Sequence, residues 1–120
     1  MKLKLQKDFR HTYRFAPHDY FESYTLHVKV KKENPEWTPW ESVCPCSLHI
    51  IYDSNENKYG HHWRVSSWSD RMDKQMNELL GSDFKSYPSR KEMLRDLQKI
   101  VLANRPVHYV MGKEIVYELD

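Results

Sequence analysis

Apolar and polar side chains alternate along the first half of the chain with the period of two that is typical of β-strands. The clearest alternation covers residues 24–31, whose apolar members are a tyrosine, a leucine and two valines. This pattern predicts a half-buried strand. Residues 32–40 break the alternation, and we expect a loop there because Pro35 and Pro39 have no N–H group to donate to a sheet.

Residues 2–6 and 9–15 alternate in the same way and predict further extended segments. In the second of these, Arg10 and Arg14 fall on the side opposite the aromatic residues. We therefore expect both arginines to point away from the core. Residues 16–22 contain a proline and an aspartate, which favour a connection rather than a strand.

Two more apolar-rich runs, 43–52 and 59–66, flank a cluster of turn-forming residues and predict a β-hairpin. A turn centred between the runs would place His49 opposite His62 and Ile50 opposite His61. The apolar face of this hairpin would carry Cys44, Cys46, Leu48, Ile50, Trp63 and Val65, and its polar face Ser47, His49, His62, Arg64 and Ser66.

Two later stretches repeat their apolar residues with the period of an α-helix. The first, 68–80, follows Ser67, which has an acidic residue three positions later as in a capping box, and it ends at Gly81. The second, 90–103, follows Ser89 in a similar box. Each helix has a single apolar stripe, so both are expected to pack on one face of the sheet.

The order of these elements predicts one α+β domain over residues 1–120. No strand–helix–strand alternation occurs early in the chain, so the sheet should be mainly antiparallel. Residues 107–111 and 114–119 flank a Gly-Lys pair and predict a C-terminal β-hairpin. The core is expected to contain Leu26, Val28, Leu48, Ile50, Trp63, Met76, Leu97 and Ile100.

Composition agrees with a small globular domain. The chain has 120 residues, of which 39% are hydrophobic and 30% charged, a balance that disordered and collagen-like chains do not show. The first residues lack the apolar stretch of a signal peptide, and no apolar run approaches the roughly 18 residues of a membrane span. We therefore expect a soluble, cytoplasmic protein that does not insert into a membrane.

The polar positions of the predicted strands are rich in cations. They are Arg10, Arg14, His27, Lys29, Lys31, His49, His62 and Arg64, with Thr12, Thr25 and Ser47 between them. No carboxylate is expected among them, so a chain of net charge only +2 would still present a basic face to the phosphates of nucleic acid or to an acidic protein. An ordinary solvated sheet face would have the same composition.

Trp37 and Trp40 lie in the proline-bordered loop, and tryptophan is enriched at binding hot spots. Either residue could instead fold back onto the core, because two exposed tryptophans would make a large apolar patch. Exposed, they would suit a protein-directed inhibitor or adaptor. In its size, its absence of catalytic motifs and its 13% of aromatic residues, the chain resembles small accessory or inhibitor proteins of mobile elements, but no particular residue indicates a family.

Cys44 and Cys46 raise the question of a zinc site, because histidines lie nearby. A single residue separates them, a shorter spacing than structural zinc sites use. The expected register also turns them away from His49 and His62. We therefore expect reduced, buried and metal-free cysteines, and no cofactor.

Catalysis is a further alternative. His49 and His62, if they faced each other, could act as acid and base while Arg64 stabilised negative charge in a small hydrolase or nuclease. The sequence contains no glycine-rich phosphate loop and no nucleophile elbow to support such a site. We therefore expect a non-catalytic binding module that uses the basic sheet face and the tryptophan loop against a polyanionic surface. The inhibitor and the hydrolase remain alternatives.

Overall fold

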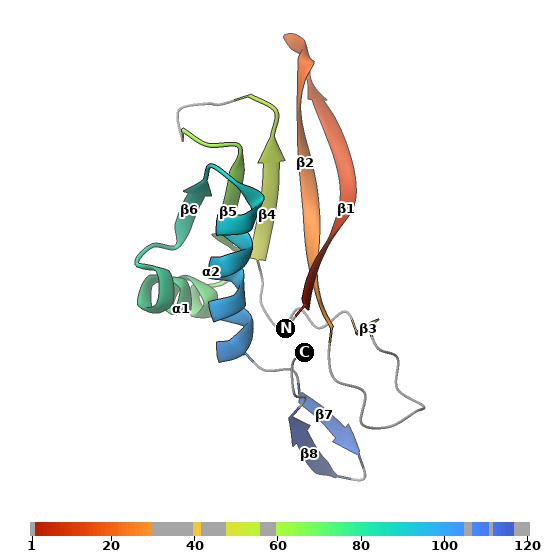
Figure 1. Ribbon diagram of the computed structural model, residues 1–120, viewed down its shortest axis with the longest axis vertical. Coiled ribbons are helices and arrows are strands. Elements are labelled where there is room, and N and C mark those ends of the chain that lie inside the picture. Colours follow the sequence, from red (N-terminus) through yellow and green to blue (C-terminus); the bar gives the residue numbers. More distant parts are fainter. Residues whose placement is uncertain are drawn as a thin grey trace.

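The main feature of the computed structural model is an antiparallel sheet with strand order β1-β2-β4-β5-β6 (Figure 1). The structure describes residues 2–29, 40–41, 48–55, 60–104, 107–110 and 112–116. The sheet strands are β1 (Lys2–Tyr13), β2 (Ala16–Lys29), β4 (Leu48–Asp53), β5 (Trp63–Ser67) and β6 (Phe84–Tyr87). The short β3 (Trp40–Glu41) also pairs with β2. The helices are α1 (Asp70–Leu80) and α2 (Arg90–Ala103), and β7 (Val107–Val110) and β8 (Lys113–Val116) form a separate two-stranded sheet. The α+β class and the mainly antiparallel sheet are confirmed.

β1 and β2 form a long hairpin that extends beyond the neighbouring strand β4 in Figure 1. The prediction that residues 16–22 are a connection is wrong, because these residues form the first half of β2. Pro17 is tolerated there because the β1–β2 register skips between its pairs Thr12–Tyr20 and Tyr13–Ala16. Since Pro17 falls in this skipped stretch, its missing N–H leaves no gap in the ladder.

A second irregularity lies at Asp8 and reverses the faces of β1. Lys7 pairs with Tyr24, but the next pair is Phe9 with Ser23, so Asp8 is an extra residue on β1. Such a bulge moves every later side chain to the opposite face. The alternation predicted for residues 9–15 is present only as far as Tyr13, because residues 14 and 15 form the turn to β2. Its direction is wrong: Phe9 leaves the core face and Arg10 joins it.

Among its described residues, the β4–β5 hairpin has the predicted faces but not the predicted pairs, while Cys44, Cys46 and Ser47 lie outside these residues. Ile50 pairs with Val65 rather than His61, and His49 pairs with Ser66 rather than His62. The register is therefore displaced by four residues. An even displacement keeps each side chain on its own face, so the division into an apolar and a polar face survives.

The helix termini follow from their caps. α2 has the predicted bounds, and the Ser89 hydroxyl accepts a hydrogen bond from the backbone N–H of Glu92. α1 begins later than predicted, because its N-cap is Ser69 and not Ser67. Trp68 consequently lies outside the helix. Gly81 ends α1 in the left-handed conformation, at φ 82°.

Both helices contribute to one hydrophobic cluster with the sheet. Its buried members are Leu5, Leu26, Val28, Ile50, Val65, Met72, Met76, Tyr87, Met93, Leu97, Ile100 and Val101. Six of the eight predicted core residues are in this set, and the other two, Leu48 and Trp63, are partly buried against it. Strand β6 was not predicted, because its four residues contain only two aromatic residues and are too few to show an alternation.

No helix in the described part of the chain is long and apolar enough to cross a bilayer.

Candidate functional site

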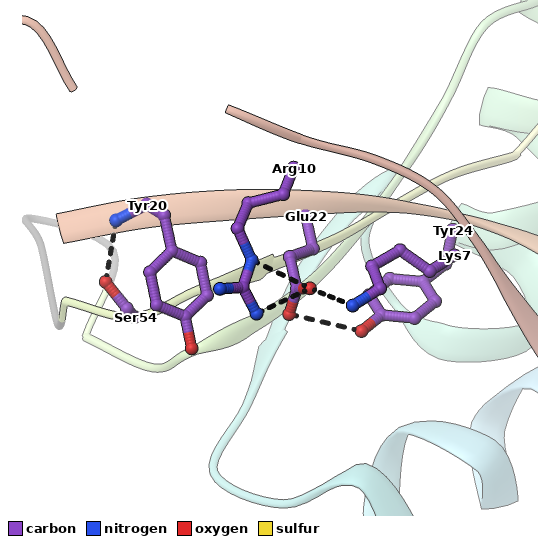
Figure 2. A network of polar contacts seen from close by, with 6 residues as sticks. All are labelled: Lys7, Arg10, Tyr20, Glu22, Tyr24 and Ser54. Atoms are coloured by element: carbon purple, nitrogen blue, oxygen red, sulfur yellow. Dashed lines mark hydrogen bonds and ion pairs between the residues drawn. The ribbon is translucent and has the colours of Figure 1, made fainter. Parts of the chain in front are cut away.

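Arg10 does not lie on an uninterrupted basic face, contrary to the sequence expectation. Its guanidinium donates to a carboxylate oxygen of Glu22 from Nε at 3.3 Å and from one terminal nitrogen at 3.2 Å. Lys7 contacts the same oxygen at 2.8 Å, and the Tyr24 hydroxyl donates to the other oxygen at 3.3 Å (Figure 2). Glu22 comes from the segment that was predicted to be a connection. Once β2 includes that segment, the register pairs Glu22 directly with Arg10.

The Glu22 network is a buried anion covered by two half-exposed cations. Glu22 is 5% exposed, whereas the Arg10 side chain is 50% exposed and its guanidinium lies 4.0 Å from the centre of the Tyr20 ring. Burial acts to raise the pKa of Glu22, but the hydrogen bonds from Lys7 and Arg10 outweigh it and hold the pKa below the usual range. The carboxylate is therefore charged at neutral pH and fixes both cations in place.

Arg64 is likewise held by a carboxylate. Its guanidinium lies 3.2 Å from Asp53, whose side chain is 1% exposed, and the Arg64 side chain itself is only 14% exposed. The Tyr13 hydroxyl donates to the same carboxylate at 2.6 Å, and the backbone N–H of Asn55 donates to its other oxygen at 3.1 Å. Burial, followed by the contact with Asp53, raises the pKa of Tyr13. The expectation that no carboxylate interrupts the basic residues is therefore wrong at both Arg10 and Arg64.

The remaining predicted cations are dispersed. Arg14 lies in the β1–β2 turn, with its guanidinium 5.5 Å from the Phe15 ring centre. His27 is on β2, and its Nε2 is buried without a hydrogen-bond partner among the described residues. Lys29 is the last residue of β2, while Lys31 lies outside the described residues.

His49 and His62 do not form the predicted pair. His49 stacks on Trp68, with ring centres 4.6 Å apart, whereas the His62 ring lies near Tyr52 and its Nδ1 is 2.9 Å from the Asp53 carbonyl oxygen. The two histidines therefore occupy different ends of the β4–β5 ladder, about 13 Å apart at 3.3 Å per residue. Burial and then the charge of Arg64 lower the pKa of His49, which favours a neutral ring. This arrangement gives no acid–base pair.

Exposed aromatic rings are the feature that the sequence prediction missed. Phe9 is 52% exposed and Trp68 is 68% exposed. Both line a groove of about 490 Å³ whose other residues include Asp8, Thr25 and His49, and the Thr25 hydroxyl donates to the Asp8 carboxylate at 2.6 Å. Phe9 comes from β1 and Trp68 from the segment after β5, so the two rings flank the seam between β2 and β4. The signal that could have revealed Phe9 is the bulge at Asp8, which alternation alone does not show.

Three of the four remaining candidate residues lie outside the described residues, and the fourth lies in a short strand. Trp37, Cys44 and Cys46 lie outside the described residues, so the tryptophan and thiol predictions stay predictions. Trp40 begins the two-residue strand β3 rather than ending a loop. Within the described ranges, no three metal-binding side chains lie close enough to hold an ion.

Comparison with known proteins adds no functional assignment to this geometry. No family model, curated protein or solved structure matches the chain. The function is therefore inferred from the described residues.

Proposed function

We propose that this chain is a non-catalytic binding module that binds nucleic acid on the sheet face opposite its helices. The cluster that contains helix residues such as Met76 and Ile100 also contains Ile50 and Val65 from the sheet. His49 and Arg64 alternate with those two strand residues and so lie on the other face. We infer from this that both helices cover one face, whereas the other face carries the groove with the exposed rings of Phe9 and Trp68.

The observation that carries the proposal is the pair of exposed rings beside the groove. An unpaired base is flat and stacks on aromatic side chains, and each such contact contributes about 1–3 kcal/mol to binding. Phe9 and Trp68 supply two rings that are more than half exposed, although Trp68 already contacts His49 on one side. His49 and Thr25 add polar atoms at the groove wall. Single-stranded nucleic acid fits this arrangement better than a duplex, whose bases are stacked on each other.

Charge has a smaller role at this face than the sequence predicts. Arg10 and Arg64 are engaged by buried carboxylates, so we assign them to the stability of the sheet. Arg14 and Lys29 are the remaining basic candidates for phosphate contacts among the described residues, and Lys31 lies outside them. Their contribution adds to that of the rings and weakens with salt.

The test is the affinity for a fluorescein-labelled oligo-dT strand, measured by fluorescence anisotropy. The double variant Phe9→Ala/Trp68→Ala should lower the affinity by at least tenfold, because two stacking contacts are lost. Its dependence on salt should stay the same, because no charge is removed. Leu79→Ala, which truncates an exposed apolar residue of α1, is the control and should bind like the natural chain.

Two results would reject the proposal. One is unchanged affinity in the double variant when circular dichroism shows it folded. The other is an absence of oligo-dT binding by the natural chain together with binding of an acidic peptide of similar length, which would assign the face to a protein partner.

A further inference from the structure

Helix α2 carries a second basic surface that the sequence analysis did not identify. A groove of about 530 Å³ is lined by Arg90, Lys91, Leu94, Arg95 and Gln98. At 100° per residue these five positions fall on one flank of the helix, beside the stripe that packs into the core. The groove is thus a continuous feature of α2 and not a chance meeting of distant residues.

The cations of this groove differ from those of the hairpin in having no carboxylate partner. Arg90, Lys91 and Arg95 are all exposed, and none of them makes an ion pair with another residue in the described part of the chain. Among the described residues, none that lines the groove is acidic. Three positive charges therefore face solvent within about 7.5 Å of helix length, at 1.5 Å per residue.

The acidic residues of α2 are directed elsewhere. Asp96 lies on the other flank, where it accepts a hydrogen bond from the Tyr87 hydroxyl at 2.8 Å and contacts Lys85 at 3.3 Å and Lys99 at 3.5 Å. Glu92 is exposed in the first turn, but it is not a groove residue. The positive end of the helix dipole adds to the potential near Arg90.

We propose that the α2 groove binds the phosphodiester backbone of a nucleic acid. Charge complementarity supports this occupant, because two arginines can each form paired hydrogen bonds with phosphate oxygens. The described residues of the wall include an aliphatic and an amide side chain but no aromatic ring, so the groove suits contacts to phosphates rather than to bases. The proposal rests on the proposed function in taking nucleic acid as the partner, but it uses none of the residues of the open sheet face.

The experiment compares two charge-matched double variants on neighbouring helices. Arg90→Gln/Arg95→Gln removes two cations from the groove, and Arg71→Gln/Lys74→Gln removes two exposed cations from α1. The affinity of each for labelled oligo-dT is measured across a series of salt concentrations. The groove variant should lose at least tenfold in affinity at low salt, and its slope of log affinity against log salt should fall by about 1.4, or 0.7 per lost phosphate contact. The α1 variant should keep the natural slope.

Equal losses in the two variants would overturn the proposal, because they would reflect net charge alone. Oligo-glutamate bound as tightly as oligo-dT, with the same loss in the groove variant, would overturn the phosphate assignment in favour of an acidic protein. If Phe9→Ala/Trp68→Ala binds normally while the groove variant does not, the sheet-face proposal fails and the α2 proposal stands. If the groove variant binds normally while Phe9→Ala/Trp68→Ala does not, the α2 proposal fails and the sheet-face proposal stands.

Discussion

The β1–β2 hairpin and helix α2 both carry cations, but the fold treats them differently. Within the sheet, Arg10 of the hairpin is fixed by Glu22, and Arg64 on β5, which β4 separates from the hairpin, is fixed by Asp53. On α2, Arg90 and Arg95 have no such partner among the described residues. A cation that contacts a buried carboxylate is fixed in place and its charge is at least partly compensated, so it contributes mainly to the fold. A cation without one contributes mainly to the surface potential.

This difference shows why counting basic residues on predicted strands does not locate a binding surface. The carboxylate at Glu22 lies beside Arg10 only because β1 and β2 pair in one particular register. The charge that remains for a partner is set by these pairs and not by the composition of a face. Removing a carboxylate partner should therefore lower the stability of the fold, whereas removing a cation of α2 should lower the affinity for a partner.

The largest effect is expected from Asp53→Ala. This change removes a carboxylate that is 1% exposed and leaves the mostly buried guanidinium of Arg64 without its 3.2 Å contact. Losing one partner of a buried ion pair costs about 3–5 kcal/mol of the free energy of unfolding. Urea denaturation should show this loss, whereas Asp83→Ala, which truncates an exposed carboxylate, should change the midpoint little. Equal midpoints for the two variants would contradict a structural role for Asp53.

A smaller effect is expected from Glu22→Gln, because Lys7 and Arg10 are half-exposed and can be solvated when their anion is lost. Replacing a hydrogen-bonded charge by a neutral amide should cost about 1–3 kcal/mol at neutral pH. The folded-state pKa of Glu22 lies below its ordinary value of 4.5, so its stabilising effect is present above that pH and is lost as the pH falls through the folded-state pKa.

Urea denaturation at several pH values checks whether the stabilising effect of Glu22 is lost on acidification. The difference in the free energy of unfolding between the natural chain and Glu22→Gln should be largest near pH 7 and should shrink below about pH 4. Glu78→Gln, at an exposed position of α1, provides the control. A difference that grew on acidification would show that burial, and not the cations, dominates the pKa of Glu22.

The parts of the fold that were predictable from the sequence are those that local patterns determine. The bounds of α2 follow from the Ser89 cap and the apolar period, and the faces of the β4–β5 hairpin follow from alternation. The bulge at Asp8 and the skip around Pro17 depend on how two strands align, which no local pattern specifies. These irregularities exposed Phe9 and brought Glu22 to Arg10.

The candidate site was less predictable than the fold for the same reason. Its residues were chosen because their side chains were expected on the face of the sheet away from the core. A one-residue insertion in a strand moves the later side chains to the opposite face. Trp68 was assigned to the apolar stripe of a helix, but the cap at Ser69 excludes it and leaves it exposed beside His49. The cations of α2 were visible in the sequence, but only the placement of Asp96 towards Lys85 and Tyr87 shows that they are not neutralised.

The most direct test of this account compares Arg10→Gln with Arg95→Gln in the salt dependence of oligo-dT binding. Both variants remove one arginine from a solvent-accessible position, and circular dichroism establishes that both are folded. Arg95→Gln should lower the slope of log affinity against log salt by about 0.7, because one phosphate contact is lost, while Arg10→Gln should leave the slope unchanged. An equal fall in both variants, or a fall in Arg10→Gln alone, would contradict the division between cations that hold the fold and cations that bind a partner.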